Sequence, residues 1–218
     1  LLDPAQLDSV DWDVFDAATN RKASFGDQHF LLRWANHILP LMDRQHLWGL
    51  AASAECPSAC GGNEDEAHLL RCPHPARQPP RAALYQSLTA TFRPHHADPW
   101  LRQILLSFLA LFDPSITYNL NALTAPYRRL LDLQTALGAE SLAYGHFHQS
   151  WVSLQQNYLS SQGHPCDRRQ AKTPVTKWAQ LFQKTAREQW AVRNGHLHDT
   201  LDDQNPHAET LLRLTVKP

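Results

Sequence analysis

Four side chains that bind soft and borderline metal ions lie between residues 56 and 72, and they constrain this chain more than any other feature. They are Cys56, Cys60, His68 and Cys72, in the pattern C-x3-C-x7-H-x3-C. Three thiolates and one imidazole complete the tetrahedral ligand set of Zn²⁺, so no position remains for water or a substrate. The pattern therefore predicts a structural zinc ion that staples the chain locally.

The local sequence explains how the two pairs of ligands would meet. Pro57 and the two glycines at 61 and 62 predict a tight turn that carries the first two cysteines. Residues 64–71 are expected to form a helix, and His68 in that segment lies four positions before Cys72, which directly follows it. Side chains four positions apart lie on one helical face, close enough to reach one ion.

Other interpretations of the cysteines remain open. A disulfide would require an oxidising compartment, and the sequence shows no signal-peptide pattern. His74, two residues beyond Cys72, is a plausible substitute ligand, and Cys166 stands alone and is interpreted as a free thiol. We expect an intracellular location, either nucleus or cytoplasm, and no membrane partner, because no run of 18 apolar residues occurs.

Helical spacing of apolar residues recurs along most of the chain, and no stretch alternates with period two for long enough to form a sheet. The expected fold class is all-α, an irregular multi-helix array with one small structural zinc module. Asp98-Pro99 and Thr173-Pro174 are each typical of a helix start. Residues 140–160 are expected to form one long helix, and the histidines at 146, 148, 196 and 198 are interpreted as surface residues.

Composition along the chain predicts four segments. Residues 1–78 would hold N-terminal helices and the zinc-binding module, and residues 79–160 a helical core. Residues 161–172 would be a polar linker, and residues 173–218 a basic amphipathic helix followed by an acidic tail.

Charge is unevenly distributed, although the formal net charge is only −1. Five aspartates and no basic residue occur in positions 1–20, whereas positive charges cluster between Lys172 and Arg193 with Trp178, Phe182 and Trp190 among them. Such a segment can bind phosphates and stack bases. The alternative is an amphipathic helix whose aromatic residues are core and whose lysines face solvent.

A longer pattern surrounds the metal ligands. It comprises Arg33-Trp34, Leu39-Pro40, Arg44, Cys56-Pro57, Cys60, the acidic turn at 64–66, His68-Leu69-Leu70 and Cys72-Pro73. This stretch resembles the zinc-binding region that follows the polymerase domain in non-LTR retrotransposon reverse transcriptases. Residues 189–194 also resemble the W-x-x-R-N segment that follows that region. Two features depart from the family: x3 replaces the usual x2 between the first cysteines, and Ala67 replaces a frequent Glu.

The resemblance implies a nucleic-acid-binding region that acts on RNA or DNA of a mobile element, joined in cis to a polymerase domain. Its metal positions fall on Cys56, Cys60, His68 and Cys72. Residues expected to contact nucleic acid are basic ones, namely Arg33, Arg44, Arg71, Lys177, Lys184 and Arg187.

No catalytic site of its own is expected. The paired aspartates of a polymerase strand turn do not occur, since Asp202-Asp203 lies in a polar tail, and no strand-rich segment could carry an RNase H site. Because the sequence starts at Leu1-Leu2, it is expected to be a piece of a longer product. The alternative function is a helical protein-interaction or structural domain whose zinc is purely a fold staple.

Overall fold

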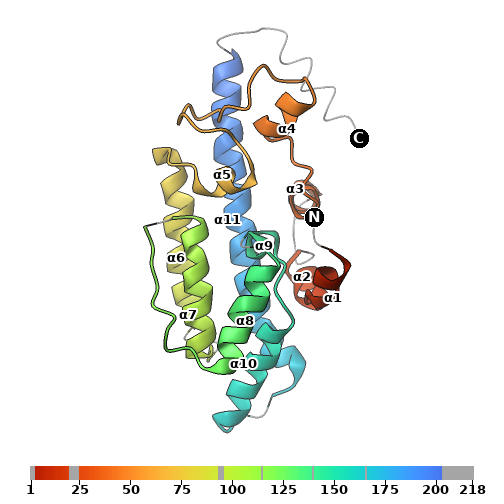
Figure 1. The fold of residues 1–218 in the computed structure, drawn as a ribbon, viewed down its shortest axis with the longest axis vertical. Coiled ribbons are helices and arrows are strands. Elements are labelled where there is room, and N and C mark those ends of the chain that lie inside the picture. The colour runs from red at the N-terminus through yellow and green to blue at the C-terminus, as the bar shows by residue number, and fades with distance from the viewer. Residues whose placement is uncertain are drawn as a thin grey trace. The chain divides into compact units, whose positions relative to one another are not determined.

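A computed structural model describes residues 3–19, 25–92, 96–113, 115–138, 140–164 and 166–202 (Figure 1). Their regular secondary structure is helical, and the described ranges contain no strands beyond two isolated antiparallel bridges, Val10 with His148 and Glu55 with Asn63. The predicted all-α class is therefore confirmed. No helix in these ranges combines the length and apolar character needed to cross a membrane.

The chain divides into two compact units, and each combines two stretches that are distant in sequence. Unit 1 consists of Leu1–Leu39 and Pro79–Arg187, and unit 2 of Pro40–Gln78 and Glu188–Pro218. The long helix α11 (Arg168–Asp202) contributes residues to both. Neither unit coincides with one of the four segments predicted from composition, because packing joins stretches that the sequence separates. The acidic tail expected after this helix lies outside the described residues.

Unit 1 surrounds the first part of α11 with short and medium helices. These are α1 (Pro4–Ser9), α2 (Trp12–Thr19), α3 (Phe25–Ala35), α6 (Gln78–Phe92), α7 (Pro99–Ser107) with the 3-10 turn η2 (Phe108–Leu111), α8 (Ala125–Ala136), α9 (Ser141–Tyr144) and α10 (Ser150–Ser161). The ring of Trp178 in α11 lies 6.1 Å from that of Trp151 and 6.0 Å from that of Phe92. The ring of Phe182, one turn later, packs against Phe112 and Phe147.

The start of α7 agrees with the sequence prediction. The Asp98 carboxylate accepts a hydrogen bond from the N–H of Trp100 at 2.8 Å, and Pro99 occupies the first helical position. Asp98 is fully buried, and its second carboxylate oxygen accepts a hydrogen bond from the hydroxyl of Tyr127 on α8. The cap therefore also joins two helices of the core.

The start of α11 differs from the prediction. The helix begins at Arg168, five residues before Thr173, and contains Pro174 within it. Asp167 and Gln170 exchange hydrogen bonds between side chain and backbone at 2.7 and 3.0 Å. This reciprocal pair satisfies free N–H groups of the first helical turn. The helix therefore starts directly after Asp167, and not at Thr173-Pro174 as the sequence predicted.

Residues 140–160 also differ from the single helix that was expected. Helix α9 ends at Gly145, whose φ of +88° is left-handed, and α10 begins only at Ser150. The interpretation of His146 and His148 as surface residues is wrong, since their exposed fractions are 5% and 6%. The segment between the helices is buried because Gln134 on α8 satisfies its backbone, accepting the His148 N–H at 2.9 Å and donating to the His146 carbonyl at 2.9 Å.

Unit 2 is small and contains the four predicted metal ligands. Its helices are α4 (Met42–Leu47), α5 (Glu66–Arg71), the 3-10 turn η1 (Pro75–Arg77) and the part of α11 from Glu188 onward. Leu41, Leu69 and Leu70 are fully buried in it. With so few apolar side chains, the unit has little hydrophobic core, and small units of this kind commonly depend on a metal ion or other cross-link.

Candidate metal centre

The structure brings the four predicted ligands together at one point. The ligand atoms of Cys56, Cys60, His68 and Cys72 all lie within 4.8 Å of one another. The Sγ atoms of Cys56 and Cys72 are 3.8 Å apart, and Cys60 Sγ is 3.2 Å from His68 Nε2. A tetrahedral ion with thiolate bonds of about 2.3 Å requires ligand separations of about 3.8 Å. The group therefore has the size and chemistry to hold one metal ion.

A tight turn positions the first two cysteines. The backbone of Glu55 pairs with that of Asn63, and the Cys56 N–H donates to the Gly62 carbonyl at 2.8 Å. Within the loop Ala59 and Gly61 have φ values of +51° and +82°, which turn the chain back on itself. Left-handed backbone of this kind is accessible to glycine at little cost, which explains the glycine at position 61.

Gly62 is required for a different reason. A Cβ atom at this position would lie 2.8 Å from Cε1 and 3.1 Å from Nδ1 of the His68 ring. The turn thus approaches the imidazole more closely than any larger residue would allow. This contact fixes the ring between the turn and α5.

Helix α5 positions the second pair of ligands. Asp65 caps the helix by accepting the His68 N–H at 2.6 Å, and Cys72 is the C-terminal cap whose N–H donates to the His68 carbonyl at 2.7 Å. The two ligands are therefore one helical turn apart on the same face, as the sequence predicts. Leu69 and Leu70 between them are fully buried and anchor the helix.

Burial and hydrogen bonding affect the three thiols differently. Burial raises the pKa of Cys72 to about 11 and also raises the pKa of Cys56. Burial opposes ionisation of Cys60 as well, but hydrogen bonds from the Gly62 N–H and from the other two cysteines lower its pKa. Metal ligation requires deprotonated thiols, so binding of an ion would release protons chiefly from the two buried cysteines.

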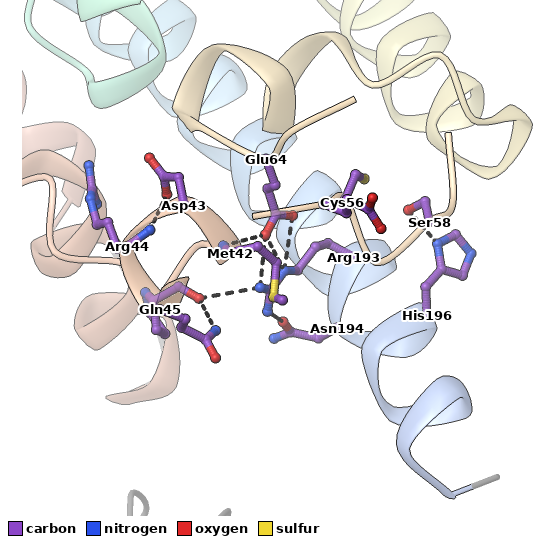
Figure 2. Close-up of polar contacts among 12 residues, drawn as sticks. Met42, Asp43, Arg44, Gln45, Cys56, Ser58, Glu64, Arg193, Asn194 and His196 are labelled. Carbon is purple, nitrogen blue, oxygen red and sulfur yellow. Dashed lines mark hydrogen bonds and ion pairs between the residues drawn. The ribbon is translucent and has the colours of Figure 1, made fainter. Parts of the chain in front are cut away.

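A buried ion pair ties the end of α11 to this turn (Figure 2). Glu64 directly precedes the cap of α5, and its carboxylate accepts hydrogen bonds from Arg193 Nε and Nη2 at 2.9 to 3.1 Å. Both side chains are at most 2% exposed. Glu64 also accepts the Met42 N–H at 2.9 Å, so one carboxylate joins α4, the metal turn and α11.

A second set of contacts links α11 to the metal turn. Arg77 is fully buried and donates to the Gln189 carbonyl, while the Gln189 side-chain amide donates to the Arg77 carbonyl at 2.9 Å. Ser58, between the first two cysteine ligands, lies 3.4 Å from Arg77 Nη2 and 2.7 Å from His196 Nδ1. Gln189, Arg193 and His196 therefore form one side of unit 2.

The basic residues predicted to contact nucleic acid are divided between the two units. Arg33, Lys177, Lys184 and Arg187 belong to unit 1, whereas Arg44 and Arg71 belong to unit 2. Arg187 pairs with Asp27, and Arg44 pairs with Glu66 at 2.6 Å. Lys177, Lys184 and Arg71 have exposed side chains, and Arg33 is half-buried.

The three aromatic residues that lie among the basic residues of α11 differ in their exposure. Trp178 and Phe182 are fully buried in the core of unit 1, so they cannot stack on bases. Trp190 is partly exposed and lies under the guanidinium of Arg193, whose carbon is 4.7 Å from the ring centre. Trp178 and Phe182 therefore fit the alternative stated above, an amphipathic helix whose aromatic residues belong to the core.

Sequence reasoning missed several residues around the centre. Spacing gave no reason to select Ser58, Glu64 or Arg77, whose roles depend on partners more than 100 positions away. The W-x-x-R-N segment was a usable signal, because it contains Arg193, the partner of Glu64, and Asn194, whose side-chain oxygen accepts from Arg193 at 3.0 Å.

Comparison with known proteins found no match to a family model, to a curated protein or to a solved structure.

Proposed function

We propose that Cys56, Cys60, His68 and Cys72 bind one structural zinc ion, and that the chain is the nucleic-acid-binding C-terminal region of a retrotransposon reverse transcriptase, without a catalytic site of its own. Zinc suits the ligand set because it accepts three thiolates and an imidazole in tetrahedral geometry. With all four positions taken by protein, the ion has no place for a reacting water.

One observation carries the retroelement proposal. The two stretches that resemble the family, the cysteine-histidine region and the W-x-x-R-N segment, are separated by more than 100 residues of sequence. In unit 2 they are joined by the buried contact between Arg193 and Glu64. The two segments that resemble the same family therefore contact each other within one folded unit, and this contact supports the proposal.

The zinc proposal is tested by metal content and folding. Purified protein should contain one zinc per chain by mass spectrometry, and Cys72→Ser should lose it together with part of the helicity. Metal binding contributes on the order of 10 kcal/mol to folding in modules of this kind. Cys166→Ser is the matched control, since this fourth cysteine is outside the group and belongs to unit 1.

The nucleic-acid proposal is tested by the salt dependence of binding. Lys177 and Lys184 are exposed and seven positions apart, so they share a face of α11. Each phosphate contact contributes about 0.7 to the slope of log affinity against log salt on single strands and about 0.9 on duplex DNA. Lys177→Gln/Lys184→Gln should reduce the slope by about two contacts, whereas the charge-matched Arg102→Gln/Arg129→Gln variant on α7 and α8 should not.

A second function has its own observation. Leu47, Trp48 and Leu50 lie at and just after the end of α4 in unit 2 and are 80%, 53% and 73% exposed. Neighbouring exposed apolar side chains are typical of a protein-binding surface. If the protein binds one zinc but neither RNA nor DNA at low salt, an interaction domain whose zinc is only a staple becomes the better explanation.

A further inference from the structure

The buried charges of unit 2 do not cancel among themselves. Among its described residues the buried charged side chains are Glu64, Arg77 and Arg193. Glu64 and Arg193 neutralise each other through their ion pair. This leaves the positive charge of Arg77, which stays protonated at all ordinary pH values.

The hydrogen-bond partners of Arg77 are neutral. Its guanidinium donates to the Gln189 carbonyl, lies 3.5 Å from the Gln189 side-chain oxygen, and lies 3.4 Å from the Ser58 hydroxyl. Its Nε–H has no hydrogen-bond partner among the described residues. A buried charge without a counter-charge is strongly unfavourable, so a negative group close to Arg77 is required.

The metal ligands are the candidates for that negative group. Ser58, which Arg77 reaches, lies between ligands Cys56 and Cys60 in the turn. Burial lowers the pKa of Arg77, negative charge on Cys72, on Cys56 and then on Glu64 opposes that effect, and the positive charge of Arg193 offsets that of Glu64. Through Ser58 the guanidinium therefore reaches the turn that carries two of the four candidate ligands.

The charge of the filled centre is set by its ligands. A divalent ion contributes two positive charges, three thiolates contribute three negative charges, and a neutral imidazole contributes none. We propose that Arg77 is the counter-charge of the metal centre: its single positive charge balances the single negative charge of a divalent ion held by three thiolates. This inference rests on the proposed metal site and adds a positioning residue to it.

The same side chain connects the centre to α11. Arg77 donates to the Gln189 carbonyl and its own carbonyl accepts from the Gln189 amide, so helix and counter-charge hold each other in place. Groups that contact metal ligands indirectly commonly change metal affinity by about 10- to 100-fold when they are removed. A purely structural link to Gln189 would also lower affinity, so the test must separate charge from packing.

A double-mutant cycle makes that separation. Cys60→His replaces one thiolate by a neutral ligand, which makes a divalent centre electrically neutral, and Cys60 is the least buried of the three cysteines. Zinc affinity is measured by competition with a chromophoric chelator for Arg77→Met in the wild-type and Cys60→His backgrounds. We expect a loss of about 10- to 100-fold in the first background and less than about 3-fold in the second.

Two further readouts keep the test decisive. Arg77→Lys keeps the charge while it alters the hydrogen bonds to Gln189, so it should retain affinity within about 3-fold. Bound Co²⁺ reports thiolate ligation by its sulfur charge-transfer absorption. This absorption should saturate at a higher Co²⁺ concentration in Arg77→Met than in Arg77→Lys, because the negative charge of the filled centre then lacks its counter-charge.

The outcomes distinguish the inference from the proposed function. If wild-type protein takes up no metal, the metal site fails, and the inference fails with it. If wild-type protein binds one ion but Arg77→Met loses equal affinity in both backgrounds, or loses none, the metal site stands and the counter-charge is overturned. Equal losses of zinc affinity in Arg77→Lys and Arg77→Met would also overturn the counter-charge. If Arg77→Met fails to fold, an equal failure of Arg77→Lys overturns it in the same way.

Discussion

Glu64 and Arg193 are 129 positions apart in the chain and form a buried ion pair through three contacts of 2.9 to 3.1 Å. Both side chains also form hydrogen bonds with backbone groups. Glu64 accepts the Met42 N–H, and Arg193 donates to the Pro40 carbonyl at 3.3 Å. Unit 2 therefore depends on a polar contact where a larger domain would have an apolar core.

Removing one member of this pair should be more harmful than removing both. Arg193→Met leaves the Glu64 carboxylate buried without a counter-charge, and we expect a loss of about 3–5 kcal/mol in the free energy of unfolding. Glu64→Gln/Arg193→Met removes both charges, while the introduced amide oxygen can still accept the Met42 N–H, so the double variant should recover much of that loss. Urea unfolding of metal-saturated protein measures both, and a double variant no more stable than Arg193→Met would contradict this account.

The close approach of Gly62 to His68 predicts a specific effect on metal binding. A Cβ at Gly62 would displace the imidazole, since it would lie 2.8 Å from Cε1, so Gly62→Ala should weaken zinc affinity measurably. Gly61→Ala is the matched control: its φ is +82°, but a Cβ there meets nothing within 4 Å. That change should cost about 1 kcal/mol in stability through backbone strain with little effect on metal affinity. Equal effects of the two variants on metal affinity would refute the steric explanation.

The buried His146 should make unit 1 sensitive to acid. Burial lowers the pKa of His146 to about 4, with a smaller effect of His37, and Nδ1 has no hydrogen-bond partner among the described residues. In the unfolded chain the pKa is about 6.5, so the unfolded state binds more protons between these values. Stability is then fully present above pH 6.5 and decreases as pH falls toward 4, by on the order of 3 kcal/mol.

His146→Phe tests this dependence. The variant should flatten the decrease in unfolding free energy between about pH 6.5 and pH 4, as followed by chemical unfolding at a series of pH values. Burial lowers the pKa of His148 as well, so some dependence should remain. An unchanged pH profile in the variant would mean that His146 is not the titrating group.

Gln134 is expected to be among the most sensitive positions of unit 1. It is fully buried and makes four hydrogen bonds, to Ser141 Oγ, the His146 carbonyl, the His148 N–H and Trp151 Nε1, at 2.7 to 2.9 Å. Gln134→Met would leave these partners unsatisfied at a cost of about 1–3 kcal/mol for each group that water cannot reach. Thermal unfolding compared with the exposed control Gln103→Met measures the difference. A similar small shift in both would show that the network contributes little.

The four candidate metal ligands could be predicted from sequence because their geometry is local. His68 and Cys72 are one helical turn apart, and the turn of the first two cysteines is closed by bonds within a few residues, such as Cys56 N–H to the Gly62 carbonyl. Helix start signals were only partly sufficient. Asp98 caps α7 as predicted, whereas Asp167 preceded the expected start of α11 and prevailed over Thr173-Pro174.

Long-range contacts account for what the sequence could not reveal. His146 and His148 were judged by helical spacing, but the left-handed Gly145 ends the helix before them and Gln134 buries them. The spacing of Trp178 and Phe182 is compatible with a core helix and also with a base-stacking surface. Only the residues that pack against them distinguish these two possibilities. The W-x-x-R-N segment singles out Arg193, but nothing in the local sequence links Arg193 to Glu64.

The position of Arg193 in the sequence determines when, during synthesis on the ribosome, the ion pair with Glu64 can form. All four metal ligands have been synthesised once Cys72 is added, but Arg193 comes about 120 residues later, roughly 10 s at typical rates of translation. During that interval the cysteine turn is already synthesised while Glu64 still lacks its ion-pair partner. Each newly made molecule therefore passes through a stage in which the cysteine turn is followed by a carboxylate without its ion-pair partner, and completion of α11 ends that stage.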